Sequence, residues 1–151
     1  MNTKRVYAYL FVTGQMIFLF CLVFLSNNLG THFQPQTSLG YVLKVVGAAG
    51  LIVSAGSLRR TLTAIPIPKE SGILSTNGLY KYVRHPMYTA LLVFSAGMAL
   101  GSGSALKCAF FFVLLILLYF KSRFEEDLLI LKYPDYKEYA HRTPRFLPRL
   151  R

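Results

Sequence analysis

The stretch that decides the fold class is Phe110-Phe111-Phe112-Val113-Leu114-Leu115-Ile116-Leu117-Leu118, part of an apolar run from Ala105 to Phe120. Three similar runs precede it in the 151 residues: Val6–Leu25, Leu39–Leu58 and Met87–Leu100. A helix rises about 1.5 Å per residue, so about 20 apolar residues cross the hydrocarbon core of a bilayer. The sequence therefore predicts an all-α membrane protein with about four transmembrane helices.

The two halves of the chain differ in character. The first two runs are expected to form an N-terminal helical hairpin over residues 1–58. The third and fourth runs are shorter and are joined by Gly101-Ser102-Gly103-Ser104, which predicts a tight helical hairpin. Met1 to Arg5 followed by an apolar run could also begin a secretory signal, but the run is long for one and no clear cleavage site follows. We therefore expect the first run to be a membrane span in a single domain over residues 1–151.

Positive charge is distributed unevenly along the chain. The net charge is +11, and all but two of the 17 Lys and Arg lie in residues 4–5, 59–84 and 121–151. The connector Ser26 to Ser38 carries no charged residue. This pattern follows the positive-inside rule rather than indicating a nucleic-acid surface. It predicts a multi-pass protein of the bacterial inner membrane or an equivalent membrane, with both termini and the loop 59–84 in the cytoplasm.

Polar residues meet the start of the third run. The sequence there is Leu79-Tyr80-Lys81-Tyr82-Val83-Arg84-His85-Pro86-Met87-Tyr88. Pro86 is suited to the first turn of a helix, with His85 just outside it. Arg84, His85 and the unpaired amides after Pro86 together can bind a carboxylate. Alternatively, Arg84 only anchors the span to lipid headgroups and His85 only caps the helix.

Acidic residues gather just after the last run. Five of the six lie between Glu125 and Glu138, on a helix expected to continue to Ile130 and to be followed by a short helix over residues 136–141. On a helix, Glu126 shares a face with Tyr119 and Arg123, whereas Glu125 points about a quarter-turn away. The two glutamates are therefore expected to have different roles. The alternative is a solvated acidic turn with local ion pairs. Both cysteines lie within apolar runs, so neither a disulfide framework nor a metal site is predicted.

The two polar segments together resemble a known signature. Residues 77–88 resemble the Gly-x-Tyr-x-x-x-Arg-His-Pro-x-Tyr motif of the isoprenylcysteine carboxyl methyltransferases, and the related phospholipid N-methyltransferases carry a similar Arg-His-Pro-x-Tyr. Residues 123–129, with their Glu-Glu pair, are similar to the second half of that signature. Residues 133–139 and 144–148 are similar to the closing tyrosine and proline segments. The resemblance covers residues 66–149, with one departure: Ala90 stands where many members have Gly.

This resemblance implies an S-adenosylmethionine-dependent methyltransferase built within the membrane, with residues 59–151 as its core and cytoplasmic tail. The cofactor would lie in a cytosol-facing pocket between the last two spans, the loop before them and the tail, flanked by aromatic residues such as Phe146. A soluble nucleotide-binding fold is not indicated, because no Gly-x-Gly-x-x-Gly follows a strand. The implied site contains no metal. Its catalytic residues would be Arg84, Arg123 and Glu126, and its cofactor-binding residues His85, Tyr88, Glu125, Glu126 and Tyr136.

The methyl acceptor is expected to be an amphiphilic or lipid-like molecule that arrives from the bilayer. Carboxyl O-methylation is favoured over phospholipid amine N-methylation. Arg123 or Arg84 would hold a carboxylate acceptor, whereas Glu126 or His85 would take the proton of an amine. One glutamate would order the cofactor and the other would order Arg123 or the acceptor, with Glu126 expected nearer the pocket. Two other classes remain open: a membrane reductase with a nicotinamide cofactor, and a non-catalytic scaffold or small transporter. The sequence leaves the oligomeric state open.

Overall fold

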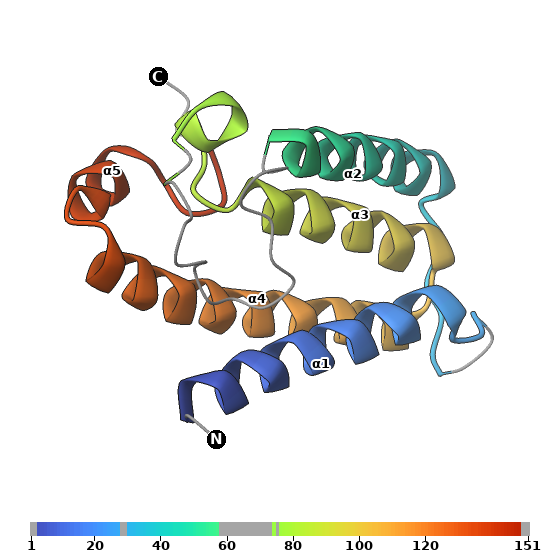
Figure 1. The fold of residues 1–151 in the computed structure, drawn as a ribbon. Coiled ribbons are helices and arrows are strands. Elements are labelled where there is room, and N and C mark those ends of the chain that lie inside the picture. The colour runs from blue at the N-terminus through green and yellow to red at the C-terminus, as the bar shows by residue number, and fades with distance from the viewer. Residues whose placement is uncertain (1–2, 28–29, 58–73, 75, 149–151) are drawn as a thin grey trace.

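The computed structural model describes residues 3–27, 30–57, 74 and 76–148 (Figure 1). These residues form a set of helices: α1 (Thr3–Phe24), α2 (Thr37–Ser57), the 3₁₀ helix η1 (Gly78–Lys81), α3 (Pro86–Ser102), α4 (Ala105–Lys132) and α5 (Tyr136–Arg142). Helices α1, α2 and α4 are long and apolar enough to cross a membrane, and α3 is a shorter apolar helix. The predicted all-α membrane fold is confirmed.

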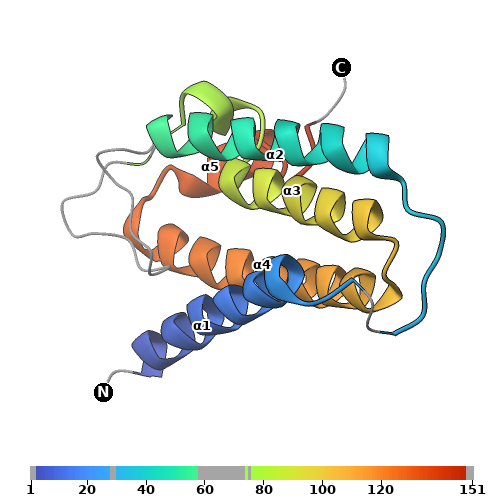
Figure 2. The same ribbon diagram turned by 90° about the vertical axis from the view of Figure 1, so that its right-hand side faces the viewer.

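The four long helices pack in two pairs (Figures 1 and 2). Helix α2 lies along α3, α1 crosses α4, and contacts between α3 and α4 join the pairs. The first two helices therefore pack chiefly on α4 and α3, respectively. The division of the chain at residue 58 falls outside the described residues and stays a prediction.

Small residues bring α2 and α3 into close contact. A Cβ atom added at Gly47 would lie 2.4 Å from the backbone nitrogen of Phe94. One added at Gly97 would lie 2.7 Å from the carbonyl oxygen of Gly40. Only glycine allows the backbones to approach this closely, which is a common basis of helix association in lipid.

The predicted tight connection between α3 and α4 is also confirmed. Gly103 ends α3 in the left-handed conformation, with φ of 66°, and the Ser104 side chain accepts from the backbone N–H of Lys107 to cap α4. The preceding loop binds this turn, because Phe33 N–H donates to the Gly103 carbonyl at 2.8 Å and Ala105 N–H donates to the Thr31 carbonyl at 3.0 Å. Backbone hydrogen bonds thus hold the turn and the loop together at this end of the molecule.

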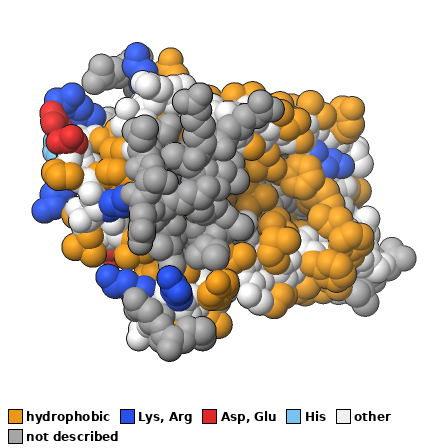
Figure 3. Space-filling model, viewed as in Figure 1, with side chains coloured by type: hydrophobic (Ala, Val, Ile, Leu, Met, Phe, Trp, Pro, Cys, Tyr) orange, Lys and Arg blue, Asp and Glu red, His pale blue; other side chains and the backbone are white. Residues whose placement is uncertain are grey.

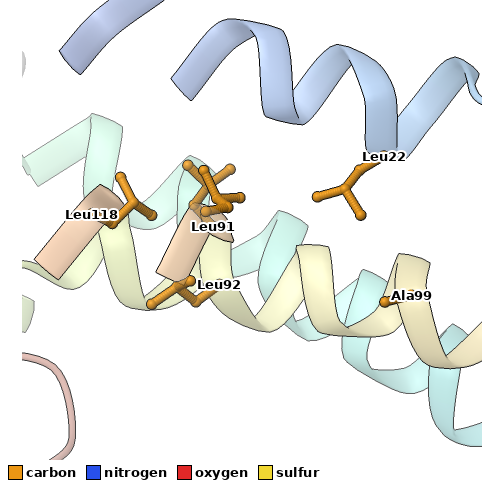
Figure 4. Packing of buried hydrophobic residues seen from close by; sticks show 6 residues of the cluster. Leu22, Leu91, Leu92, Ala99 and Leu118 are labelled. Atoms are coloured by element: carbon orange, nitrogen blue, oxygen red, sulfur yellow. The ribbon is translucent and has the colours of Figure 1, made fainter. Parts of the chain in front are cut away.

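The interior lies where α1, α3 and α4 meet (Figure 4). Its buried cluster consists of Leu22 from α1, residues of α3 and residues of α4: Leu91, Leu92, Ala99, Leu114 and Leu118. Large apolar side chains also face outward, such as Phe20 of α1, Ile52 of α2 and Ile116 of α4. An apolar exterior of this kind suits lipid rather than water.

Charged side chains gather at the opposite end, where α4 ends and α5 lies (Figure 3). Because the four helices alternate in direction, α1 begins and α4 ends there (Figure 1). Which side of the membrane the charged end faces stays a prediction.

Candidate functional site

The charged end is assembled from three segments far apart in the sequence: the start of α3, the last turns of α4 and the tail after α5 (Figure 1). Pro86 occupies the first turn of α3 with His85 just before it, as predicted. The tail lies across this helix start, since Arg84 N–H donates to the Pro144 carbonyl at 2.9 Å and His85 N–H donates to the Arg145 carbonyl at 3.1 Å. Thr89 Oγ1 also donates to the Phe146 carbonyl at 2.8 Å.

Glu126 is the centre of the charged cluster. Its side chain is 7% exposed and accepts from three cationic groups. Arg145 donates through Nε to Oε1 at 3.0 Å and through Nη2 to Oε2 at 2.6 Å. Arg84 Nη1 donates to Oε2 at 3.1 Å, and His85 Nε2 lies 3.0 Å from Oε1. One buried carboxylate therefore ties the helix start to the tail by charge-assisted hydrogen bonds.

His85 lies between the two glutamates. Its Nε2 faces Glu126, and its Nδ1 lies 3.5 Å from Glu125 Oε2. Burial alone lowers the pKa of His85, but the hydrogen bonds and negative charges of Glu125 and Glu126 outweigh it and raise the pKa above its usual value. An imidazolium can donate from both ring nitrogens, so the protonated form suits this position. The ring also stacks on Tyr88, with 5.3 Å between centroids.

Glu125 faces a different set of partners. It accepts a hydrogen bond of 2.5 Å from the Tyr88 hydroxyl. The same tyrosine ring lies 5.0 Å from Lys121 Nζ, which donates to Gln15 Oε1 at 2.6 Å. As predicted from the helical spacing, the adjacent glutamates have different surroundings. Glu126 pairs with Arg84 and with Arg145 of the tail, whereas Glu125 accepts from Tyr88 of α3, and His85 lies between the two carboxylates.

Aromatic residues of the tail complete this end. Tyr136 is 2% exposed and packs edge-on against Tyr139, whose hydroxyl donates to the Tyr80 carbonyl at 2.6 Å. Burial raises the pKa of Tyr139 to about 12, so this hydroxyl stays protonated and acts as a donor at neutral pH. The Phe146 ring lies 6.0 Å from that of His85. The structure thus brings together Arg84, His85, Tyr88, Glu125, Glu126 and Tyr136.

Arg123 is the predicted site residue that lies apart. It is exposed, and its guanidinium lies 6.0 Å from the Tyr119 ring. Within the described part of the chain, the ion pairs of the two glutamates involve Arg84, His85 and Arg145 and not Arg123. The expectation that a glutamate orders Arg123 is not met by this geometry. The position that sequence reasoning missed is Arg145, since helical spacing on α4 cannot reveal a partner from the tail.

An apolar groove of about 300 Å³ adjoins the cluster on the outer side of α4. It is lined by Leu115, Ile116, Tyr119, Phe120 and Phe146. Tyr119 adjoins both the groove and the charged cluster, because it lines the groove and its ring lies 5.2 Å from the Arg145 guanidinium. In the described residues, no group of three or more His, Cys, Asp or Glu is placed to hold a metal ion.

The fold and this site define a helical protein of the membrane with a charged cluster at one end. Residues 35–136 match the sequence model of the phospholipid methyltransferase family. The chain belongs to this family of membrane methyltransferases. The matched region contains all the residues predicted to be catalytic or cofactor-binding, and it ends before Arg145 and the flanking Phe146.

Two curated relatives are similar to this chain over most of its length. A nickel-cobalt-cadmium resistance protein of Alcaligenes xylosoxydans xylosoxydans is 33% identical over 122 residues, which cover 79% of this chain and 56% of the relative. A cobalt-zinc-cadmium resistance protein of Cupriavidus metallidurans is 32% identical over 123 residues, which cover 80% of this chain and 53% of the relative. The chain spans about half the length of these curated relatives.

Proposed function

We propose that this protein transfers a methyl group from S-adenosylmethionine to a lipid-like acceptor at the charged end of its membrane helices. The observation that carries the proposal is the buried cluster of Glu126 with Arg84, His85 and Arg145, which fixes the tail across the start of α3. The family of the chain supports methyl transfer as the reaction class. The exposed apolar helix faces support an acceptor that arrives from the bilayer.

The residues at this end fit the chemistry of the cofactor. Arg84 Nε is buried and has no hydrogen-bond partner, so it remains available to a carboxylate. Glu125 is more exposed than Glu126, at 19% against 7%, and has fewer charged partners. Glu125 is therefore the better candidate to accept from a cofactor hydroxyl or ammonium group. This assignment reverses the expectation that Glu126 lies nearer the cofactor.

In this proposal Glu126 is a positioning residue. Its two oxygens already accept four hydrogen bonds from Arg84, His85 and Arg145, which leaves little capacity for a ligand. By holding Arg84 and the tail, Glu126 would keep the cofactor-binding groups in register. Alignment matters here because transfer from a sulfonium, the chemistry that the cofactor supplies, is an in-line displacement that needs orientation and exclusion of water.

The acceptor in this proposal is a lipid-like acid that becomes a methyl ester. A carboxylate is already a nucleophile at neutral pH, so none of the site residues has to remove a proton. The alternative is methylation of a phospholipid amine, which the description of the matching family favours. In that case, a base would have to accept a proton, and Glu125 is the less fully paired of the two glutamates.

The product of a labelling experiment distinguishes the two reactions. Purified protein in nanodiscs is supplied with methyl-labelled S-adenosylmethionine and either a prenylated cysteine acid or phosphatidylethanolamine. Mild alkali releases labelled methanol from a methyl ester but leaves an N-methyl group in place. We expect alkali-labile label in the acid. Alkali-stable label in the phospholipid would favour the amine, and no transfer to either acceptor would contradict the proposed function.

A further inference from the structure

Lys121 is a buried cation that the proposed cofactor site does not use. Its residue is 4% exposed, and it lies on α4 one turn before Glu125. Gln15 of α1 accepts one hydrogen bond from its ammonium group at 2.6 Å, and Tyr88 of α3 presents its ring face at 5.0 Å. Lys121 therefore lies where three helices meet, beside a residue that contacts both His85 and Glu125.

The surroundings of Lys121 supply few partners for a buried positive charge. An ammonium group has three donors, and Gln15 accepts only one of them. Among the described residues, no carboxylate lies within ion-pair distance of Lys121, since the ion pairs of Glu125 and Glu126 involve other cations. The charge of Glu125, one turn further along α4, acts on Lys121 without forming an ion pair with it. A buried charge with so few direct partners is costly. An anionic ligand at this position would satisfy both the charge and the remaining donors.

The two arginines that the sequence suggests for the acceptor carboxylate are placed differently. Arg84 is paired with Glu126, and its remaining Nε donor is assigned above to the cofactor. Arg123 is exposed on the side of α4 that carries Tyr119. Lys121, by contrast, follows directly on the apolar run of α4 and faces the space between α4, α1 and α3. A ligand there could keep an apolar chain among membrane-facing side chains and bring an acidic group to Lys121 beside the Tyr88 ring.

Building on the proposed function, we propose that Lys121, held by Gln15, binds the carboxylate of the methyl acceptor. In the reaction, a carboxylate oxygen of the acceptor forms a bond to the methyl carbon while the bond from that carbon to sulfur breaks. The electron pair of the breaking bond stays on sulfur and leaves a neutral thioether. The acid becomes a neutral ester, no proton moves, and Lys121 no longer attracts the product.

Binding of an acid and of its neutral amide tests this role without turnover. The wild-type protein in nanodiscs is saturated with S-adenosylhomocysteine, and the affinities of radiolabelled N-acetyl-S-farnesylcysteine and its carboxamide are measured. Wild type should bind the acid about ten- to hundred-fold more tightly than the amide, as expected for a charge-assisted hydrogen bond. Lys121→Met should remove this preference, and Lys121→Arg should keep most of it.

Lys107→Met is the matched control, because Lys107 is also buried on α4 but lies in its first turn at the other end. This control should keep the preference for the acid. A preference that survives Lys121→Met, or an equal loss for acid and amide, would overturn the inference, since a general packing defect affects both ligands. If wild type binds S-adenosylhomocysteine without preferring the acid, this inference alone fails. If it does not bind S-adenosylhomocysteine, the proposed function fails with it.

Discussion

Replacing Glu126 by Gln should release the tail from the start of α3. The substitution leaves Arg84, His85 and Arg145 around a neutral amide, whose NH₂ group would face cations. Removing one partner from a buried ion pair costs about 3–5 kcal/mol. The Arg145 side chain is 22% exposed, so we expect the lower end of this range, about 3 kcal/mol. That free energy corresponds to a roughly hundred-fold increase in the equilibrium constant for opening of the tail.

Hydrogen exchange of the Arg84 and His85 amides measures this opening, because both amides donate to tail carbonyls. Exchange should be about a hundred-fold faster in Glu126→Gln than in wild type. The matched control is Glu138→Gln, which removes the exposed ion pair with Arg142 and should change stability by at most about 1 kcal/mol. Unchanged exchange in Glu126→Gln, or an equal increase in both variants, would refute the assigned role of Glu126.

Four further predictions concern packing, pH, the tail and topology. Gly47→Ala should lower the melting temperature in detergent, because its Cβ would lie 2.4 Å from the backbone of α3. Gly56→Ala on the same helix is the control: its Cβ would meet nothing within 4 Å, so the melting temperature should not fall. The folded-state pKa of His85 is raised, so its stabilising charge is fully present below about pH 6.5 and is lost as the pH rises through the folded value. The melting temperature should therefore fall as the pH rises through that value, and His85→Gln should remove this fall. Truncation before Tyr133 should abolish binding of S-adenosylmethionine without preventing membrane insertion, and normal affinity would show that the tail is dispensable. A reporter fused after Arg151 should be cytoplasmic, and an external reporter would reverse the topology.

Much of the fold follows from local sequence properties. The length of the apolar runs predicts the membrane helices, and the Gly-Ser connector predicts the turn between α3 and α4, because Gly103 tolerates a positive φ. The pairing of the helices does not follow from these properties. Most faces of α1 and α2 are apolar, so composition does not show that α1 packs on α4 and α2 on α3.

The candidate site was predictable where its residues share an element or a recognised motif. Helical spacing separates Glu125 from Glu126, and Arg84-His85-Pro86 marks the start of α3. The partnership of Glu126 with Arg145 joins α4 to an irregular tail, and no periodicity links those two positions. The contact between Gln15 and Lys121 likewise depends on how α1 crosses α4.

Binding of S-adenosylmethionine to the purified protein tests the central claim most directly. The measurement is titration calorimetry of the full chain in nanodiscs, with S-adenosylhomocysteine and a reduced nicotinamide cofactor as competitors. We predict saturable binding that S-adenosylhomocysteine displaces and the nicotinamide does not. Binding of the nicotinamide in its place, or no binding of S-adenosylmethionine, would contradict the assignment as a methyltransferase.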